Sequence, residues 1–223
     1  MGREPAGPAG HGELAGHPDR VRWNARYSGG IAASFAAHPL AARALSMGLP
    51  AGPVLDLACG PSGSALRAAA AGRRVTAVDA SEVALGLLGQ EARRRGLSDL
   101  ITLVHADLGA WRPEPGSYAL VLCTGYWDGA LFAPAATAVA AGGLLAWEAF
   151  TAGARTARPG LRAPWCLRPG EPASLLPANF DVVDQHDLPD SERGTKRSLL
   201  ALRRATPKRS PGRLDVADRR VLR

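Results

Sequence analysis

Glycines and carboxylates stand in this sequence where short apolar runs end. Gly60 and Gly63 follow the apolar run 54–57, and Asp79 and Asp107 follow the next two runs. Glycines let the backbone turn sharply and approach a ligand closely. A carboxylate at the end of a second strand can accept hydrogen bonds from both hydroxyls of a ribose. Asp107 lies where an adenine edge would follow, so the combination predicts a site for an adenosine-containing ligand.

The spacing of these glycines and carboxylates distinguishes a site for an adenosine cofactor without phosphates from a dinucleotide or phosphate-binding site. Asp79 lies 19 residues after Gly60, which suits a carboxylate that binds a ribose. The loop lacks both the G-x-G-x-x-G pattern of dinucleotide sites and the G-x-x-x-x-G-K-[ST] phosphate loop. An adenosine cofactor without phosphates therefore fits better, and a nicotinamide-dependent oxidoreductase is the disfavoured alternative.

Alternating strand and helix patterns must position these residues. Predicted helices cover 63–71, 81–95 and 128–141, and Pro39 divides two shorter helices between Trp23 and Leu49. The predicted strands are Val54–Leu57, Val75–Val78, Ile101–Val104, Tyr118–Leu122, Leu144–Trp147, Phe180–Asp184 and Ser198–Leu202. This order predicts an α/β protein with a parallel sheet and helices on both faces. Ligands bind such sheets at the carboxyl ends of the strands.

Five ordered segments resemble the motifs of class I S-adenosylmethionine-dependent methyltransferases. They are VLDLACGPSG (54–63), VTAVDAS (75–81), HADLGAW (105–111), YALVLC (118–123) and AAGGLLAWEAF (140–150). Within that superfamily, the segments 22–27, 148–151 and 167–171 resemble the tellurite-resistance methyltransferase-like branch. The resemblance covers residues 22–204. It implies a Rossmann-like, seven-stranded and mostly parallel sheet with an antiparallel last strand, and S-adenosyl-L-methionine as cofactor. The three widely spaced cysteines argue against a zinc site, so no metal is expected.

The resemblance also implies which residues bind the cofactor. The glycine loop would surround its amino-acid moiety, and Asp79 would bind its ribose. Adenine would lie against Asp107 and Leu108, Cys123 would line the floor, and N-terminal aromatic residues would close the site. The full implied set is Asp56, Ala58, Cys59, Gly60, Gly63, Asp79, Ala80, Asp107, Leu108, Cys123, Trp23 and Tyr27.

No catalytic residue is assigned from the sequence, but three candidates stand near the predicted site. Tyr126 and Asp128 follow the fourth strand, where an acceptor would approach; Asp128 could equally cap the next helix. His105 could act as a base or as a hydrogen-bonded structural residue. No carboxylate–histidine pair stands out, which favours an acceptor that needs no base, such as a thiol or a chalcogen oxyanion.

A further set of arginines has two interpretations. Arg162, Arg168 and Arg197 could form a lid that recognises an anion, or each could be a solvated surface residue. Arg168 could also anchor its own Pro-Gly-Glu turn through Glu171.

The positive charge of the chain is concentrated at one end. The net charge is +7, and residues 192–223 hold 11 Arg and Lys against 3 Asp and Glu. We therefore predict a disordered lead over 1–20, a methyltransferase domain over 21–205 with its cofactor motifs in 53–150, and a basic disordered tail over 206–223. A non-catalytic binding module that touches RNA through this tail is the second alternative, although the nearly neutral body does not favour a nucleic-acid partner.

The composition sets the remaining expectations. Apolar residues make up 46% of the 223 residues and charged residues 21%, which is typical of a globular protein. Cys59, Cys123 and Cys166 form no CxxC pair, so a reducing cytoplasm is expected. No apolar stretch is long enough to span a membrane. We expect a small-molecule methyl acceptor, and the sequence does not indicate an oligomeric state.

Overall fold

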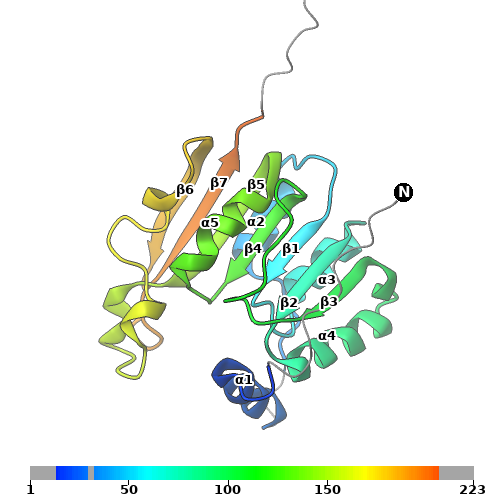
Figure 1. Cartoon of the computed structure of the whole chain (residues 1–223), viewed down its shortest axis with the longest axis horizontal. Helices are drawn as coiled ribbons and strands as arrows, with labels where there is room; N and C mark the ends of the chain where they lie inside the picture. Colours follow the sequence, from blue (N-terminus) through cyan, green and yellow to red (C-terminus); the bar gives the residue numbers. More distant parts are fainter. Residues whose placement is uncertain (1–13, 30–32, 206–223) are drawn as a thin grey trace, which may run out of the picture.

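The computed structural model describes residues 14–29 and 33–205 (Figure 1). The predicted basic tail, 206–223, lies outside the described residues, as does most of the predicted lead. Within the described part, no helix is both long and apolar enough to cross a membrane.

A single seven-stranded sheet forms the centre of the molecule (Figure 1). Its strand order is β3-β2-β1-β4-β5-β7-β6. The strands are β1 (Val54–Leu57), β2 (Val75–Asp79), β3 (Ile101–His105), β4 (Tyr118–Thr124), β5 (Val139–Phe150), β6 (Phe180–Leu188) and β7 (Lys196–Arg203). The first five strands pair in parallel, and β7 runs antiparallel to both of its neighbours. The predicted sheet and its antiparallel last strand are confirmed.

Five α-helices accompany the sheet in the described residues. They are α1 (Pro18–Ser28), α2 (Pro39–Ser46), α3 (Gly63–Ala70), α4 (Glu82–Arg94) and α5 (Gly129–Ala138). Short 3-10 turns lie at Ser98–Leu100, Ala152–Arg155, Ala163–Trp165 and Ala173–Leu175. Hydrophobic side chains of α2, α3 and α4 pack into one core cluster, and those of α5 pack into another. Helices therefore cover both faces, as predicted.

The central strands are buried on both faces because helices cover each side. Every residue of β1 is buried, as are the first six of the seven residues of β4. Leu120 and Leu122 belong to the α2–α4 cluster, whereas Val121 and Cys123 belong to the α5 cluster. A strand buried on both sides reads as a continuous apolar run, and these runs are why the sequence locates the strands so well.

The boundary predicted between the fifth helix and the fifth strand is wrong. The helix ends at Ala138 instead of residue 141, and β5 begins at Val139, which pairs with Tyr118. The pairing with β4 is irregular between Tyr118 and Leu120. Gly142 permits this irregularity with a φ of +76°, a backbone conformation that favours glycine. The glycine pair therefore lies inside the strand and does not open it.

The predicted disorder of residues 1–20 is also wrong at its C-terminal end. Helix α1 begins at Pro18, and Leu14–Gly16 form a turn before it. Proline at the first helical position has a φ already suited to a helix, and Asp19 in the first turn complements the helix dipole. Figure 1 shows α1 beside the carboxyl ends of the parallel strands.

Candidate active site

The loop after β1 is fixed by a buried carboxyl group. Asp56 is 2% exposed, and its Oδ2 accepts a hydrogen bond of 2.6 Å from the Ser62 hydroxyl. The Ser62 Oγ in turn accepts from the backbone N of Ala65 at 2.9 Å and caps α3. Burial raises the pKa of Asp56 to about 7, against the lowering effect of the Ser62 hydrogen bond. Asp56 thus holds the loop to the start of α3.

A second carboxylate joins the loop to the end of β2. The backbone N of Gly60 donates to Asp79 Oδ2 at 2.8 Å, and the backbone N of Ser81 donates to Oδ1 at 2.8 Å. Burial raises the pKa of Asp79, and the two backbone hydrogen bonds oppose that shift. Gly60 has a φ of +57°, and Ala58 adopts the same left-handed region at +49°. These contacts fix the direction of the Asp79 carboxylate.

Gly63 serves packing and is not part of the cavity wall. A Cβ at this position would lie 2.3 Å from the backbone O of Ala36 and 2.4 Å from that of Phe35. No backbone can give way by so much without moving the segment before α2. Gly63 therefore lets α3 approach that segment closely.

Helix α1 brings two aromatic side chains over the loop. The rings of Trp23 and Tyr27 stack with centroids 5.8 Å apart and an interplanar angle of 23°. A Cβ on Gly60 would lie 2.9 Å from the Tyr27 hydroxyl oxygen, so the phenol lies directly against the glycine. Burial, followed by the charge of Asp79, raises the pKa of Tyr27 to about 12.

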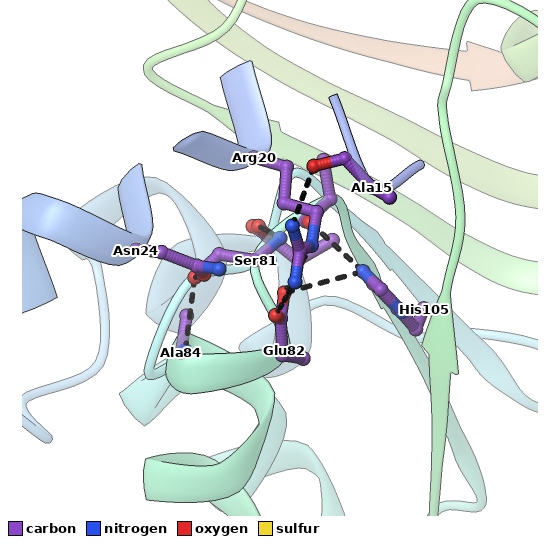
Figure 2. A network of polar contacts seen from close by, with 9 residues as sticks. Ala15, Arg20, Asn24, Ser81, Glu82, Ala84 and His105 are labelled. Carbon is purple, nitrogen blue, oxygen red and sulfur yellow. Dashed lines mark hydrogen bonds and ion pairs between the residues drawn. The ribbon is translucent and has the colours of Figure 1, made fainter. Parts of the chain in front are cut away.

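A polar network ties α1 to the start of α4 (Figure 2). Arg20 Nε donates to Glu82 Oε2 at 2.9 Å, and the Ser81 hydroxyl donates to Asn24 Oδ1 at 2.7 Å. Burial opposes ionisation of Glu82, but hydrogen bonds from Asn24 and Arg20 hold its pKa at about 2. His105 Nε2 lies 3.0 Å from the backbone O of Ala80 and 3.4 Å from Glu82 Oε2. His105 therefore belongs to this anchor.

A cavity of about 790 Å³ opens at the carboxyl ends of the strands, and we call it the strand-end cavity. Ten of the residues predicted from the sequence line it: Trp23, Tyr27, Ala58, Cys59, Gly60, Asp79, Ala80, Asp107, Leu108 and Tyr126. Five others do not: Asp56, Gly63, His105, Cys123 and Asp128. The structure thus assembles most of the predicted set around one space.

The remaining two of these five residues, Cys123 and Asp128, also have structural roles. Cys123 is fully buried, and its Sγ lies 3.6 Å from the backbone O of Tyr126. Burial raises the pKa of this thiol well above its ordinary value. Asp128 Oδ1 accepts from the backbone N of Ala130 at 2.8 Å and caps α5, which is the alternative that the sequence left open.

His17, the residue before α1, lies at the site although the sequence did not indicate it. Its Nε2 lies 3.5 Å from Asp107 Oδ1, and both side chains line the strand-end cavity. Its Nδ1 is buried and has no hydrogen-bond partner among residues 14–29 and 33–205. The expectation that no carboxylate–histidine pair stands at the site is therefore wrong. His17 was missed because the Gly- and Pro-rich segment around it shows no periodicity.

The arginine lid considered from the sequence does not form. Arg197 donates to both carboxylate oxygens of Asp187, at 2.5 and 3.0 Å. Arg162 lies over the Trp165 ring, 5.0 Å from its centroid. The backbone N of Arg168 donates to Glu171 Oε2 at 2.8 Å, so the turn is held by Glu171 through the main chain. None of the three arginines lines the strand-end cavity.

A second cavity, of about 840 Å³, lies beside the first, and we call it the hairpin cavity. The β6–β7 hairpin supplies much of its wall, from His186 to Ser198, and α2 supplies another part. Four residues line both cavities: Arg26, Phe150, Arg158 and Lys196. The two spaces are therefore neighbours that share one wall.

The described residues contain no group of three or more His, Cys, Asp or Glu side chains arranged to hold a metal ion. The three cysteines are all free thiols. The site therefore rests on the glycine loop, the strand-end carboxylates and the aromatic residues of α1.

A family of known proteins matches the part of the chain that carries most of this site. Residues 54–143 match a family described as a methyltransferase domain. That span contains the glycine loop, Asp79, Asp107 and Tyr126. A search of curated proteins found no significant sequence match.

Solved structures share the fold at low sequence identity. A putative sarcosine dimethylglycine methyltransferase from Galdieria sulphuraria aligns with a TM-score of 0.65 and 15% identity, covering 83% of this chain and 98% of that one. Geranyl diphosphate C-methyltransferase from Streptomyces coelicolor A3(2), bound to Mg²⁺, geranyl diphosphate and S-adenosyl-L-homocysteine, aligns at 0.59 and 15%, covering 89% and 91%. A structure concerned with the conversion of a disulfide bond into a thioacetal group during echinomycin biosynthesis aligns at 0.61 and 17%, covering 83% and 93%.

A methyltransferase domain thus matches residues 54–143, and the fold is that of solved class I methyltransferases, some of which contain bound S-adenosyl-L-homocysteine. The α/β sheet is the Rossmann-like sheet of that class.

Proposed function

We propose that this chain transfers a methyl group from S-adenosylmethionine to a small-molecule nucleophile. One observation carries the proposal. The Asp79 carboxylate is fixed by the backbone of Gly60 and lines the same cavity as Tyr126, which follows β4. A cofactor-binding wall and a place for an acceptor thus occur within one space.

The residues present fit this cofactor. Each oxygen of Asp79 accepts one backbone hydrogen bond, and a carboxylate oxygen has capacity for a second, so the ribose hydroxyls can be bound. The absence of a side chain at Gly60 lets the Tyr27 hydroxyl lie directly against the loop, so that the phenol closes the cavity over the glycine. Asp107 and Leu108 line the cavity where the resemblance places adenine. When bound, the cofactor supplies an electrophilic methyl group on a positively charged sulfur.

The aromatic residues of α1 exclude water and favour that positive charge. Trp23 and Tyr27 line the cavity as a stacked pair, and ring faces attract cations. Holding two reactants aligned in a space without water is the principal contribution that the chain makes to such a displacement.

Proton chemistry at the acceptor side is limited. Burial raises the pKa of Tyr126 well above its ordinary value, so its hydroxyl stays protonated and is available as a hydrogen-bond donor. We assign the His17–Asp107 pair to the adenine end of the cavity, because Asp107 follows β3. The acceptor is therefore one that arrives ionised or is nucleophilic without a base.

Narrower parts of the assignment are also proposals. Membership of the tellurite-resistance methyltransferase-like branch rests on the segments 22–27, 148–151 and 167–171. The domain limits of 21–205 rest on where the sequence motifs begin and end, with α1 starting at Pro18. A cytoplasmic location rests on three cysteines without pairing motifs.

The test is an assay of S-adenosylhomocysteine formation with single acceptors: a thiol, tellurite, a carboxylic acid and an amine. We expect product above the acceptor-free rate with at least one ionised or soft acceptor, and none from the Asp79→Ala variant. If no acceptor raises the rate while S-adenosylhomocysteine still binds, the chain is a binding module and the proposal fails. A response to NAD instead would support the oxidoreductase alternative.

A further inference from the structure

The two cavities differ in the charge of their walls. Five Arg and Lys residues line the hairpin cavity against two carboxylates, Glu148 and Asp190. Four Arg and Lys residues line the strand-end cavity against three carboxylates. The carboxylates of the strand-end cavity suit the hydroxyls and the positive charge of the cofactor. The excess of cationic side chains in the hairpin cavity suits an anionic ligand.

Two of the five Arg and Lys residues in the hairpin cavity, Lys196 and Arg43, are already paired with carboxylates. Lys196 Nζ lies 2.8 Å from Glu148 Oε1, and His38 Nε2 lies 3.3 Å from the same oxygen. Burial disfavours ionisation of Glu148, but hydrogen bonds from His38 and Lys196 outweigh it and keep its pKa below the ordinary value. Arg43 pairs with Asp184 at the edge of the cavity. These pairs stabilise the wall and leave little charge for a ligand.

Three guanidinium groups remain available. In the part of the chain that the structure describes, Arg26, Arg158 and Arg193 form no ion pair with a carboxylate. They come from three distant segments, namely the end of α1, the turns after β5, and the β6–β7 hairpin. Asp190 does not pair with Arg193 through side chains, because its Oδ1 accepts from the backbone N of Glu192 and Arg193. Planar guanidinium groups are well suited to bind oxyanions.

The shared wall links this anion-binding region to the cofactor. Phe150 lines both cavities, and the Arg158 guanidinium carbon lies 4.6 Å from its ring centroid. Lys196 Nζ lies 5.5 Å from the same centroid. An acceptor whose charged end lies in the hairpin cavity could pass over Phe150 and present its other end in the strand-end cavity.

We propose that the hairpin cavity is the acceptor subsite, and that it binds an oxyanion head group of an organic acceptor, remote from the atom that is methylated, through Arg26, Arg158 and Arg193. This inference rests on the proposed function. It narrows the substrate class to anionic organic acceptors, because a neutral acceptor of the same shape has no group that pairs with these arginines.

Arg193 separates this role from cofactor binding, because it lines only the hairpin cavity, whereas Arg26 and Arg158 line both. Arg67 is a matched control: it is an exposed arginine near the end of α3 that lines neither cavity. Both Arg193→Gln and Arg67→Gln remove one positive charge, so their comparison cancels the effect of net charge.

The experiment is a calorimetric titration of inorganic pyrophosphate into protein saturated with S-adenosylhomocysteine, at constant ionic strength. We expect saturable binding to the wild type and to Arg67→Gln, at least fivefold weaker binding to Arg193→Gln, and partial recovery in Arg193→Lys. Circular dichroism confirms that each variant is folded. The affinity for S-adenosylhomocysteine should be equal in all four proteins.

The outcomes separate the two proposals. Absence of S-adenosylhomocysteine binding would contradict the proposed function itself. Normal S-adenosylhomocysteine binding without saturable pyrophosphate binding, or equal effects of the two glutamine variants, would overturn only the acceptor subsite. Weaker S-adenosylhomocysteine binding in Arg193→Gln would assign the arginine to the cofactor and also overturn it.

Discussion

The two cavities are built in different ways. The strand-end cavity depends on backbone groups and buried carboxyls: Asp56 holds Ser62, and Asp79 holds the backbone of Gly60 and Ser81. The hairpin cavity depends on long, exposed side chains such as Arg158 and Arg193. We call the glycine loop and the carboxyl groups that hold it, Asp56 and Asp79, the rigid frame. A rigid frame suits a cofactor that is always the same, whereas exposed side chains can be substituted without affecting the core.

Changes to the rigid frame should therefore have the largest effects. Gly63→Ala places a Cβ 2.3 Å from the backbone O of Ala36, so we expect a loss of about 3 kcal/mol in the free energy of unfolding. Chemical denaturation measures it. Gly86→Ala is the control: it lies in α4 with open space around its Cβ and should stabilise the protein by about 0.5–1 kcal/mol. Equal stability of Gly63→Ala and the wild type would show that the frame is not tightly packed there.

The buried carboxyl of the frame should make stability depend on pH. The pKa of Asp56 is raised from 3.8 to about 7 in the folded chain, so the folded state retains a proton that the unfolded chain releases. Stability linked to this group is fully present below about pH 4 and is lost as the pH rises through about 7. The Asp56→Asn variant keeps an oxygen that can accept the hydrogen bond from the Ser62 hydroxyl. Because its amide does not titrate, the variant does not lose stability as the pH rises.

We therefore expect the stability of Asp56→Asn relative to the wild type to increase between pH 4 and pH 8 by about 4 kcal/mol. Urea denaturation of both proteins at four pH values measures the difference. A difference that stays constant with pH would mean that Asp56 is ionised throughout and that the frame tolerates a buried charge.

The ion pair that anchors α1 on α4 belongs to neither cavity's frame. Its removal should have the smallest effect on stability of the changes considered. Arg20→Gln removes a partly exposed ion pair with Glu82, so we expect less than about 1 kcal/mol of lost stability. Helix α1 carries Trp23 and Tyr27 over the cavity, so S-adenosylhomocysteine should dissociate about threefold faster, as measured by stopped-flow fluorescence.

Arg94→Gln provides the control for that measurement. It also removes an arginine–carboxylate pair, with Glu91 on α4, at a site that lines neither cavity. Unchanged dissociation in Arg94→Gln and faster dissociation in Arg20→Gln would assign the effect to α1. Equal rates in all proteins would mean that the Arg20 anchor does not hold the aromatic pair over the cofactor.

The same contrast explains what the sequence could predict. The segment from β1 to α4 follows from local patterns, since fully buried apolar runs, Ser81 as a helix cap and a glycine loop occur within 45 residues of one another. The sequence also places Gly60 and Asp79 at the same edge of the sheet, because both follow parallel strands. These features depend on contacts close in sequence.

The remaining features depend on contacts between distant segments. His17 meets Asp107 only because α1 is anchored on α4, and nothing in the sequence around His17 indicates that contact. The early start of β5 follows from its pairing with Tyr118. The hairpin cavity combines arginines from three segments, whereas the arginines chosen from the sequence form other contacts, such as that of Arg197 with Asp187.

The most direct test of the account is a calorimetric titration of S-adenosylhomocysteine into the wild type and into Asp79→Ala. The account predicts saturable one-to-one binding to the wild type. The variant loses the acceptor for the ribose and for the Gly60 backbone, so its affinity should fall at least a hundredfold, or about 2.7 kcal/mol. A folded wild type that does not bind, or an Asp79→Ala variant that binds equally well, would contradict the assignment of the strand-end cavity to this cofactor.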